Sequence, residues 1–293
     1  MPILPHNLAK LMADDIKLLI CRYVNIQIFR VAYMENYILE CCVDSVESAI
    51  NAANGGASRL ELCSNLIIGG TTPDVALVKE IRKHTDIRIH ALIRPRFGDF
   101  CYSVHEMEIM KSQIRALKEA GAEGVVIGVL DVEGNLDIKK MQELLQETSN
   151  MSVTLHRAFD MCRDPFQALD EAIELGIHTI LTSGQKQSAW EGRELLKELV
   201  EKANGKIDIM AGAGISASAI EKLAPITKGT SYHMSGKVTL DSKMKYRKAD
   251  VSMGLPSLSE YEIWQTSEDA VRAAVEVLKN ARKAAGIYFP GDI

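Results

Sequence analysis

The sequence lacks features that mark several large classes of protein. It has no long run of basic residues, and its formal net charge is -5, which argues against nucleic acid and anionic membrane surfaces as partners. It has no Cys-x-x-Cys pair, which argues against a structural zinc finger, and its six cysteines do not show the spacing of a disulfide framework. We therefore expect reduced thiols in a cytoplasmic protein.

A long uninterrupted hydrophobic run is also missing. Residues 16–33 are apolar, but Lys17, Arg22 and Arg30 interrupt them. A membrane-spanning helix needs roughly 20 mostly apolar residues, and a charge in its middle is unfavourable. A secretory signal needs an unbroken apolar core and a small-residue cleavage site, and neither is evident. We therefore expect no membrane partner, and we expect residues 1–36 to be an N-terminal extension outside the core.

The rest of the chain repeats one theme, in which a helical stretch, a glycine and a short strand follow one another. Strands are predicted at 37–43, 58–63, 87–94, 124–129, 152–157, 178–183, 207–211 and 229–234. Helices are predicted at 45–54, 73–84, 104–120, 137–147, 165–175, 189–203, 216–224 and 267–284.

This alternation favours an α/β fold, a single (β/α)8 TIM barrel over residues 37–285 with a tail at 286–293. A doubly wound sheet is the competing fold. It usually carries a glycine-rich loop after its first strand, and here the sequence at that point is Cys42-Val43-Asp44-Ser45. The chain of 293 residues is long enough for one such domain.

The first two predicted strands both end in Glu-x-Cys. Glu40 and Cys42 share one face of the first strand, and Glu61 and Cys63 share one face of the second, because side chains alternate along a strand. Neighbouring strands lie about 4.8 Å apart, so these groups should occupy one small region. That arrangement suits soft-metal binding or acid–base chemistry, and for the two cysteines inert packing is the alternative.

Polar residues also end most of the other strands, where barrel folds place their chemistry. We predict two groups around one polar cavity. The acid–base candidates are Glu40, Glu61, His156 and His233, and the candidates for holding an anion are Arg94, Arg157, Gly212, Gly214 and Ser235. Two alternatives stay open: a buried structural ion network, or a divalent-metal site on Glu61, His156 and His233.

Longer motifs follow in order between residues 37 and 285, among them LECCVDSVESA, GGASRLELCSN, IRPRFGDFCYS, HRAFDMCRDP, LTSGQ, MAGAGI and KYRKADVSMG. With these motifs the chain resembles the CutC family. The resemblance implies a TIM barrel, a cytoplasmic location and a role in copper handling. It also implies that Cys42 and Cys63 bind Cu(I), an ion that prefers thiolate ligands.

Two functional hypotheses follow. In the first, the chain is a copper homeostasis protein that binds Cu(I) through Cys42 and Cys63 at the barrel mouth. In the second, it is a barrel enzyme that acts on a small anionic or phosphorylated substrate. The sequence leaves the reaction, the substrate and the formation of a homo-oligomer open.

The segment before Met34 shows no strand–helix pattern, so we predict that the barrel folds without residues 1–33. A chain that starts at Met34 should melt at the same temperature as the full chain. Thermal denaturation followed by circular dichroism tests this. A midpoint lowered by more than about 5 °C, the shift expected for a loss of about 1–2 kcal/mol, would mean that the segment contributes to the fold.

Overall fold

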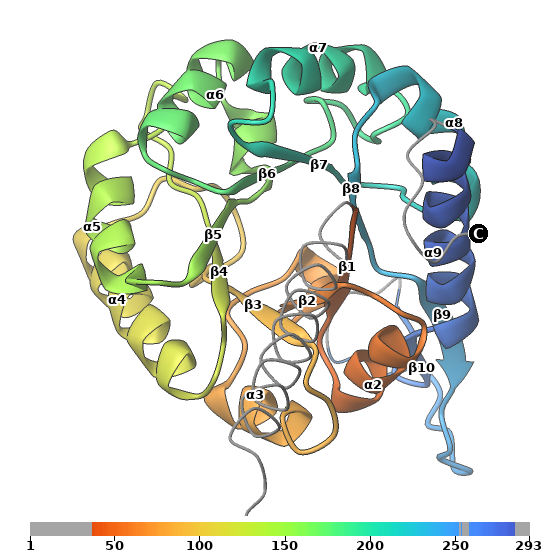
Figure 1. The fold of residues 1–293 in the computed structure, drawn as a ribbon. Helices are drawn as coiled ribbons and strands as arrows, with labels where there is room; N and C mark the ends of the chain where they lie inside the picture. The colour runs from red at the N-terminus through yellow and green to blue at the C-terminus, as the bar shows by residue number, and fades with distance from the viewer. Residues whose placement is uncertain (1–36, 252, 254–257, 285–293) are drawn as a thin grey trace, which may run out of the picture. The chain divides into compact units, whose positions relative to one another are not determined.

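The computed structural model describes residues 37–251, 253 and 258–284. The predicted extension over 1–36 and the predicted tail over 286–293 lie outside these residues. Among the described residues, parallel strands β1 to β8 close into a barrel in sequence order, and helices surround it (Figure 1). The predicted (β/α)8 fold is therefore confirmed.

Each predicted strand and helix overlaps an observed one. The barrel strands are β1 Ile38–Val43, β2 Arg59–Leu62, β3 Arg88–Leu92, β4 Gly124–Ile127, β5 Ser152–Leu155, β6 Thr179–Thr182, β7 Asp208–Ala211 and β8 Ser231–Met234. The helices are α2 Val46–Asn54, α3 Val75–Ile81, α4 Val104–Glu119, α5 Ile138–Thr148, α6 Pro165–Glu174, α7 Arg193–Ala203, α8 Ala217–Thr227 and α9 Glu268–Ala284. Two short 3-10 turns, η1 Leu66–Ile68 and η2 Arg157–Met161, follow β2 and β5.

The helices begin where short polar side chains can satisfy the free backbone N–H groups of the first turn. The hydroxyl of Ser45 accepts from the Ser48 N–H at the start of α2. Ser103 and Glu106 form a reciprocal capping box at the start of α4. No helix among the described residues is long and apolar enough to cross a membrane.

The two faces of the barrel strands differ in polarity. Residues that face the helices are apolar and fully buried, for example Leu39, Leu60 and Ile89. Residues on the opposite, interior face include an unusual number of polar groups for a barrel core, where branched aliphatic residues are typical. These buried polar residues are Glu40, Arg59, Glu61, His90, Thr154, Thr179 and Ser231.

The strand register brings the predicted site residues of β1 against those of its two neighbours. Glu40 pairs across the ladder with Arg59 of β2 and with His233 of β8. Two residues further along β1, on the same face of the strand, Cys42 pairs with Glu61 of β2. The acidic and basic side chains therefore meet inside the barrel, although they are far apart in the sequence.

A two-stranded antiparallel hairpin, which the sequence analysis did not predict, follows β8. It consists of β9 Lys237–Asp241 and β10 Glu262–Thr266. A lone hairpin is marginally stable unless it packs against other structure. Here α2 holds β10: the Thr266 N–H donates to Ser48 Oγ at 3.1 Å, and the Asn51 side chain donates to the Thr266 carbonyl at 2.9 Å. The hairpin thereby becomes part of the barrel rim.

Gly124 on β4 makes room for a histidine inside the barrel. A Cβ at this position would lie 2.4 Å from Cδ2 of His90. We predict that Gly124→Ala lowers the free energy of unfolding by about 1–3 kcal/mol, as overpacking does. Urea unfolding measures the change. The control is Gly229→Ala, whose Cβ would meet its nearest atom at 3.4 Å. Equal effects of the two substitutions would contradict the prediction.

Candidate functional site

A cavity of about 350 Å³ opens at the carboxyl ends of the barrel strands. Apolar side chains that include Leu92, Phe100 and Trp264 line part of it. Most residues of the predicted site also line it, namely Cys42, Glu61, Arg94, His156, Arg157, Gly214, His233 and Ser235. The cavity therefore collects polar groups from strands and loops across the whole barrel.

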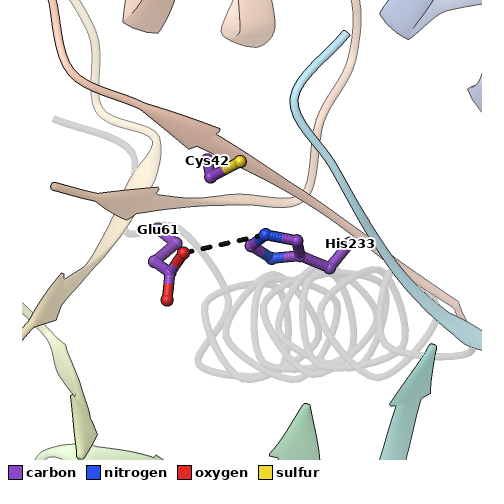
Figure 2. Close-up of side chains that lie close together, drawn as sticks. All are labelled: Cys42, Glu61 and His233. Atoms are coloured by element: carbon purple, nitrogen blue, oxygen red, sulfur yellow. Dashed lines mark ion pairs between the residues drawn. The ribbon is translucent and has the colours of Figure 1, made fainter. Parts of the chain in front are cut away.

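Three of these side chains converge on one point of the cavity. Cys42 of β1, Glu61 of β2 and His233 of β8 place ligand-type atoms within 4.8 Å of one another (Figure 2). His233 Nε2 lies 3.7 Å from Glu61 Oε2. No other such group of histidine, cysteine and acidic residues occurs among the described residues. A thiolate, an imidazole and a carboxylate are the donor types that bind transition metals in proteins.

Glu40 holds the other side of the His233 ring. Its Oε1 lies 2.8 Å from His233 Nδ1, and its Oε2 accepts from Arg59 Nε at 2.6 Å. Glu40 is fully buried, and burial alone would raise its pKa. Arg59 and His233 outweigh burial and hold the pKa of this carboxyl well below its usual range. With Nδ1 bonded to Glu40, the Nε2 of His233 is the ring nitrogen directed at Glu61.

Glu61 and His233 have shifted protonation equilibria. Burial raises the pKa of Glu61 to about 7, although His233 acts against it. Burial would lower the pKa of His233, but Cys42, Glu40 and Glu61 raise it well above its usual range. A carboxyl group with a pKa near neutrality can both take up and release a proton under cellular conditions.

Three residues of the predicted site do not line the cavity. Glu40 lies on β1 two residues before Cys42, and it forms an ion pair with Arg59. Gly212 packs against Leu181, so a Cβ there would lie 2.6 Å from Leu181 Cδ1. Neither residue is among those that line the cavity. Cys63 is the third such residue, and it lies beside the converging group.

Of the two thiols predicted to bind metal, only Cys42 lines the cavity. Cys63 is fully buried in an apolar cluster with Leu92 and Val126, and Cys42 packs against that cluster. The Cys63 thiol donates weakly to Glu61 Oε2 at 3.8 Å. Burial raises the pKa of Cys63 well above its usual range. The thiol therefore stays protonated unless a metal ion replaces the proton.

Most of the N–H donors of Arg94 bind backbone carbonyl groups at the rim of the cavity. Nη1 donates to the carbonyl of Gly70 at 3.0 Å, with longer contacts to Gly69 at 3.3 Å and Ile68 at 3.5 Å. Nη2 donates to the carbonyl of Gly98 at 3.0 Å. Arg94 therefore ties the loop after β2 to the loop after β3, and it is less available to an anion than the sequence predicted.

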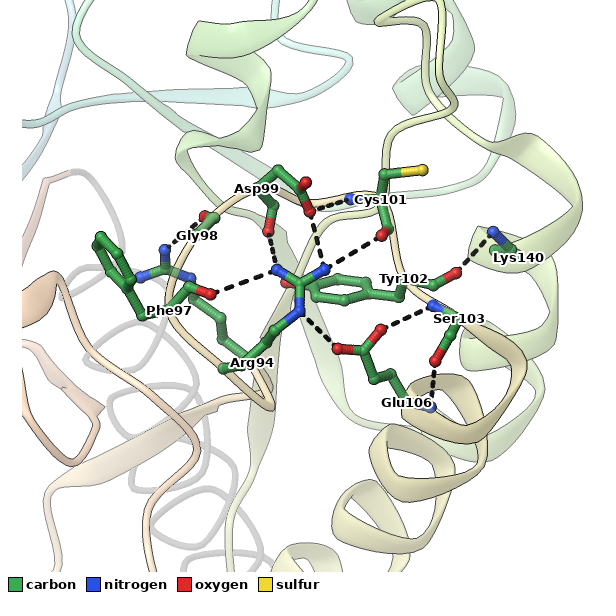
Figure 3. Close-up of polar contacts among 10 residues, drawn as sticks. Arg94, Phe97, Gly98, Asp99, Cys101, Tyr102, Ser103, Glu106 and Lys140 are labelled. Carbon is green, nitrogen blue, oxygen red and sulfur yellow. Dashed lines mark hydrogen bonds and ion pairs between the residues drawn. The ribbon is translucent and has the colours of Figure 1, made fainter.

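The loop after β3 is further held by Arg96, which stays outside the cavity. Arg96 Nη2 lies 2.8 Å from Asp99 Oδ1, and Arg96 Nε lies 2.5 Å from Glu106 Oε1. Glu106 in turn accepts from the Ser103 N–H at the start of α4 (Figure 3). Phe100, which lines the cavity, is thus carried by a braced loop.

Arg157 is held from one side and lines the cavity. Its Nε donates to Asp160 Oδ2 at 2.6 Å, and its Nη2 donates to Ser183 Oγ at 3.0 Å. Asp160 also accepts from the Ser183 N–H and from the Thr182 hydroxyl. The guanidinium group is therefore oriented before any ligand arrives, which favours anion binding.

His156 follows β5 and caps the η2 turn. Its Nδ1 accepts from the Ala158 N–H at 3.1 Å. Burial and the nearby charge of Arg94 lower its pKa to about 3. The ring is therefore neutral, and the remaining proton sits on Nε2. This geometry favours a hydrogen-bond donor at His156 over the proton-transfer role that the sequence suggested.

Sequence reasoning missed three residues of the site. Arg59 occupies the inward position two residues before Glu61, so strand alternation could have revealed it. Lys237 and Trp264 come from the hairpin, and Lys237 Nζ lies 3.1 Å from the centre of the Trp264 ring. The β-branched and aromatic residues of the two hairpin strands were the available signal.

Comparison with known proteins agrees with this architecture. A sequence model described as the CutC family matches residues 37–238. The chain is 43% identical over 245 residues to the human copper homeostasis protein cutC homolog, and the aligned region covers 83% of this chain and 90% of the human protein. The chain belongs to the CutC family. A CutC family protein from Vibrio campbellii is 44% identical over 245 residues, covering 83% of this chain and 99% of that protein.

Solved structures show the same barrel. The putative copper homeostasis protein CutC from Streptococcus agalactiae superposes with a TM-score of 0.65 at 30% sequence identity, covering 68% of this chain and 98% of that one. A deoxyribose phosphate aldolase from Aeropyrum pernix has a TM-score of 0.52 at 13% identity, covering 67% of this chain and 85% of the aldolase. The likeness to the aldolase concerns the fold alone.

We predict that Glu40→Gln lowers the free energy of unfolding of this CutC family member by about 3 kcal/mol, because it leaves the buried Arg59 without its charged partner. Urea unfolding at neutral pH measures the loss. The control is Glu80→Gln, which breaks an exposed ion pair with Lys83 on the surface and should cause no measurable change. A Glu40→Gln variant as stable as the control would contradict the assigned role.

Proposed function

We propose that this CutC family member binds Cu(I) at the barrel mouth through Cys42 and Cys63, and that it acts in copper handling in the cytoplasm. Curated relatives carry the name copper homeostasis protein, which supports the choice of metal. Cu(I) is a soft ion and prefers thiolate ligands. The five cysteines in the described residues are free, as expected where thiols stay reduced.

The observation that carries this proposal is the convergence of Cys42, Glu61 and His233 in one cavity wall. Cys42 supplies a thiolate, and His233 supplies an imidazole nitrogen. Glu40 bonds the other ring nitrogen of His233, as carboxylates commonly do for metal-binding histidines. Cys63 packs in the same cluster as Cys42 and is the candidate second thiolate.

Anaerobic titration in competition with a chromophoric Cu(I) chelator tests the proposal. Cys42→Ser should weaken Cu(I) binding by more than about 100-fold, since even the loss of a group that merely orients a ligand costs 10–100-fold. Cys63→Ser should also weaken binding if both thiols coordinate the ion. The matched control is Cys101→Ser, which removes a half-buried thiol that does not line the cavity. Equal stoichiometry and affinity in Cys42→Ser and Cys101→Ser would rule out the site.

A second candidate function is an enzyme that acts on a small anionic substrate. The specific observation in its favour is that Glu61, whose pKa burial raises to about 7, and the neutral His156 line the same cavity. In this proposal Glu61 transfers a proton while Arg157, Gly214 and Ser235 hold the anionic end of the substrate.

A further inference from the structure

Two side chains that line the cavity each carry a buried donor atom without a hydrogen-bond partner among the described residues. The two atoms are Nε2 of His156 and Nε of Arg94. Their residues are 5% and 8% exposed, and both line the cavity. Buried donors in proteins are almost always hydrogen-bonded, so two unpaired ones in a single wall call for an acceptor.

The local structure fixes the His156 ring and its proton. Because Nδ1 accepts from the Ala158 N–H, Nε2 must carry the hydrogen in the neutral ring; this tautomer is assigned from the hydrogen bond. The ring lies directly against Gly128, where a Cβ would approach its Nδ1 and Cε1 to 2.6 Å. The Phe100 ring also contacts it, with 4.9 Å between ring centres. The donor is therefore held in place before a ligand binds.

Arg94 is equally constrained. The hydrogen bonds from Nη1 to Gly70 and from Nη2 to Gly98 fix the plane of its guanidinium group. Its Cζ lies 5.2 Å from the centre of the Phe100 ring, the same ring that contacts His156. Phe100 thus joins the two donors into one wall of the cavity.

The charges around the cavity indicate what kind of acceptor fits. The arginine and lysine side chains Arg94, Arg157 and Lys237 line it together with His233, whose pKa is raised, and with a single acidic residue, Glu61. Charge-assisted hydrogen bonds from such donors favour an oxyanion over a neutral oxygen. The apolar remainder of the wall suits the carbon skeleton of a small organic molecule.

We propose that the cavity binds a small organic anion whose carboxylate or phosphate oxygens accept hydrogen bonds from His156 Nε2 and Arg94 Nε. This binding rests on the second candidate function and deepens it, since it adds His156 and Arg94 to the groups that would hold the anionic end of a substrate. It does not depend on copper. The metal-type group of Cys42, Glu61 and His233 lines the same cavity, so the anion and a bound metal ion would be neighbours.

Isothermal titration calorimetry on the full chain, with copper removed by a chelator, tests the proposal with inorganic phosphate and pyruvate as separate probes. At least one probe should bind saturably. His156→Asn should weaken that binding by at least about tenfold, the effect of losing one hydrogen bond to a charged group. The asparagine oxygen can replace Nδ1 and keep the bond from the Ala158 N–H, so the melting temperature should be unchanged.

Two further variants separate the donor from the structural role of the ring. His156→Gln restores an N–H donor near the position of Nε2 and should recover part of the binding, although it loses the bond to Ala158. The control is His178→Asn. His178 makes the same type of bond, from the Val153 N–H to Nδ1 at 3.2 Å, but it does not line the cavity. Binding in the control should equal that of the parent.

A nitrogen-15 NMR spectrum of the histidine rings is recorded on the parent protein, so this measurement does not depend on whether a variant folds. A saturating probe should shift the Nε2 signal of His156 while its Nδ1 signal stays in place. The proposal is overturned if neither probe binds the parent, if His156→Asn binds as tightly as the parent, or if the Nε2 signal does not move. Because neither copper nor turnover enters these measurements, their failure leaves the copper titration as an independent result.

Discussion

Glu40 is a buried carboxylate that contacts two basic side chains at once. One of its oxygens accepts from Arg59, and the other bonds His233 Nδ1. A buried charge without partners is very unfavourable, so these residues must keep their positions together. The same contacts orient His233 toward Cys42 and Glu61. The metal-type group at the barrel mouth thus depends on an ion pair one layer deeper in the barrel.

The polar interior of the barrel departs from the usual filling of a barrel core. Barrel cores are usually filled by branched aliphatic side chains, which leave little room. Here histidines occupy the interior, and glycines stand opposite two of them, Gly124 against His90 and Gly128 against His156. These pairs place ring nitrogens where aliphatic carbon would normally lie. Of the two rings, that of His156 lines the cavity.

The rim of the cavity is assembled from segments that are far apart in the sequence. Arg94 joins the loops after β2 and β3, and α2 holds the hairpin that brings Lys237 and Trp264 to the cavity. The proposed copper site and the proposed anion site therefore share this one cavity.

Strand alternation and the helix–glycine–strand rhythm predicted the barrel and brought most site residues to the correct end, because these patterns are local and periodic. They could not predict that Glu40 is enclosed by Arg59 or that the loop carrying Leu66 and Gly70 covers Cys63. They also could not show that the Ala158 N–H sets the tautomer of His156. The sequence by itself therefore determined which residues face the barrel interior. Only the tertiary structure decided which of those residues reach the cavity and which proton each one holds, since both depend on burial and on partners from distant segments.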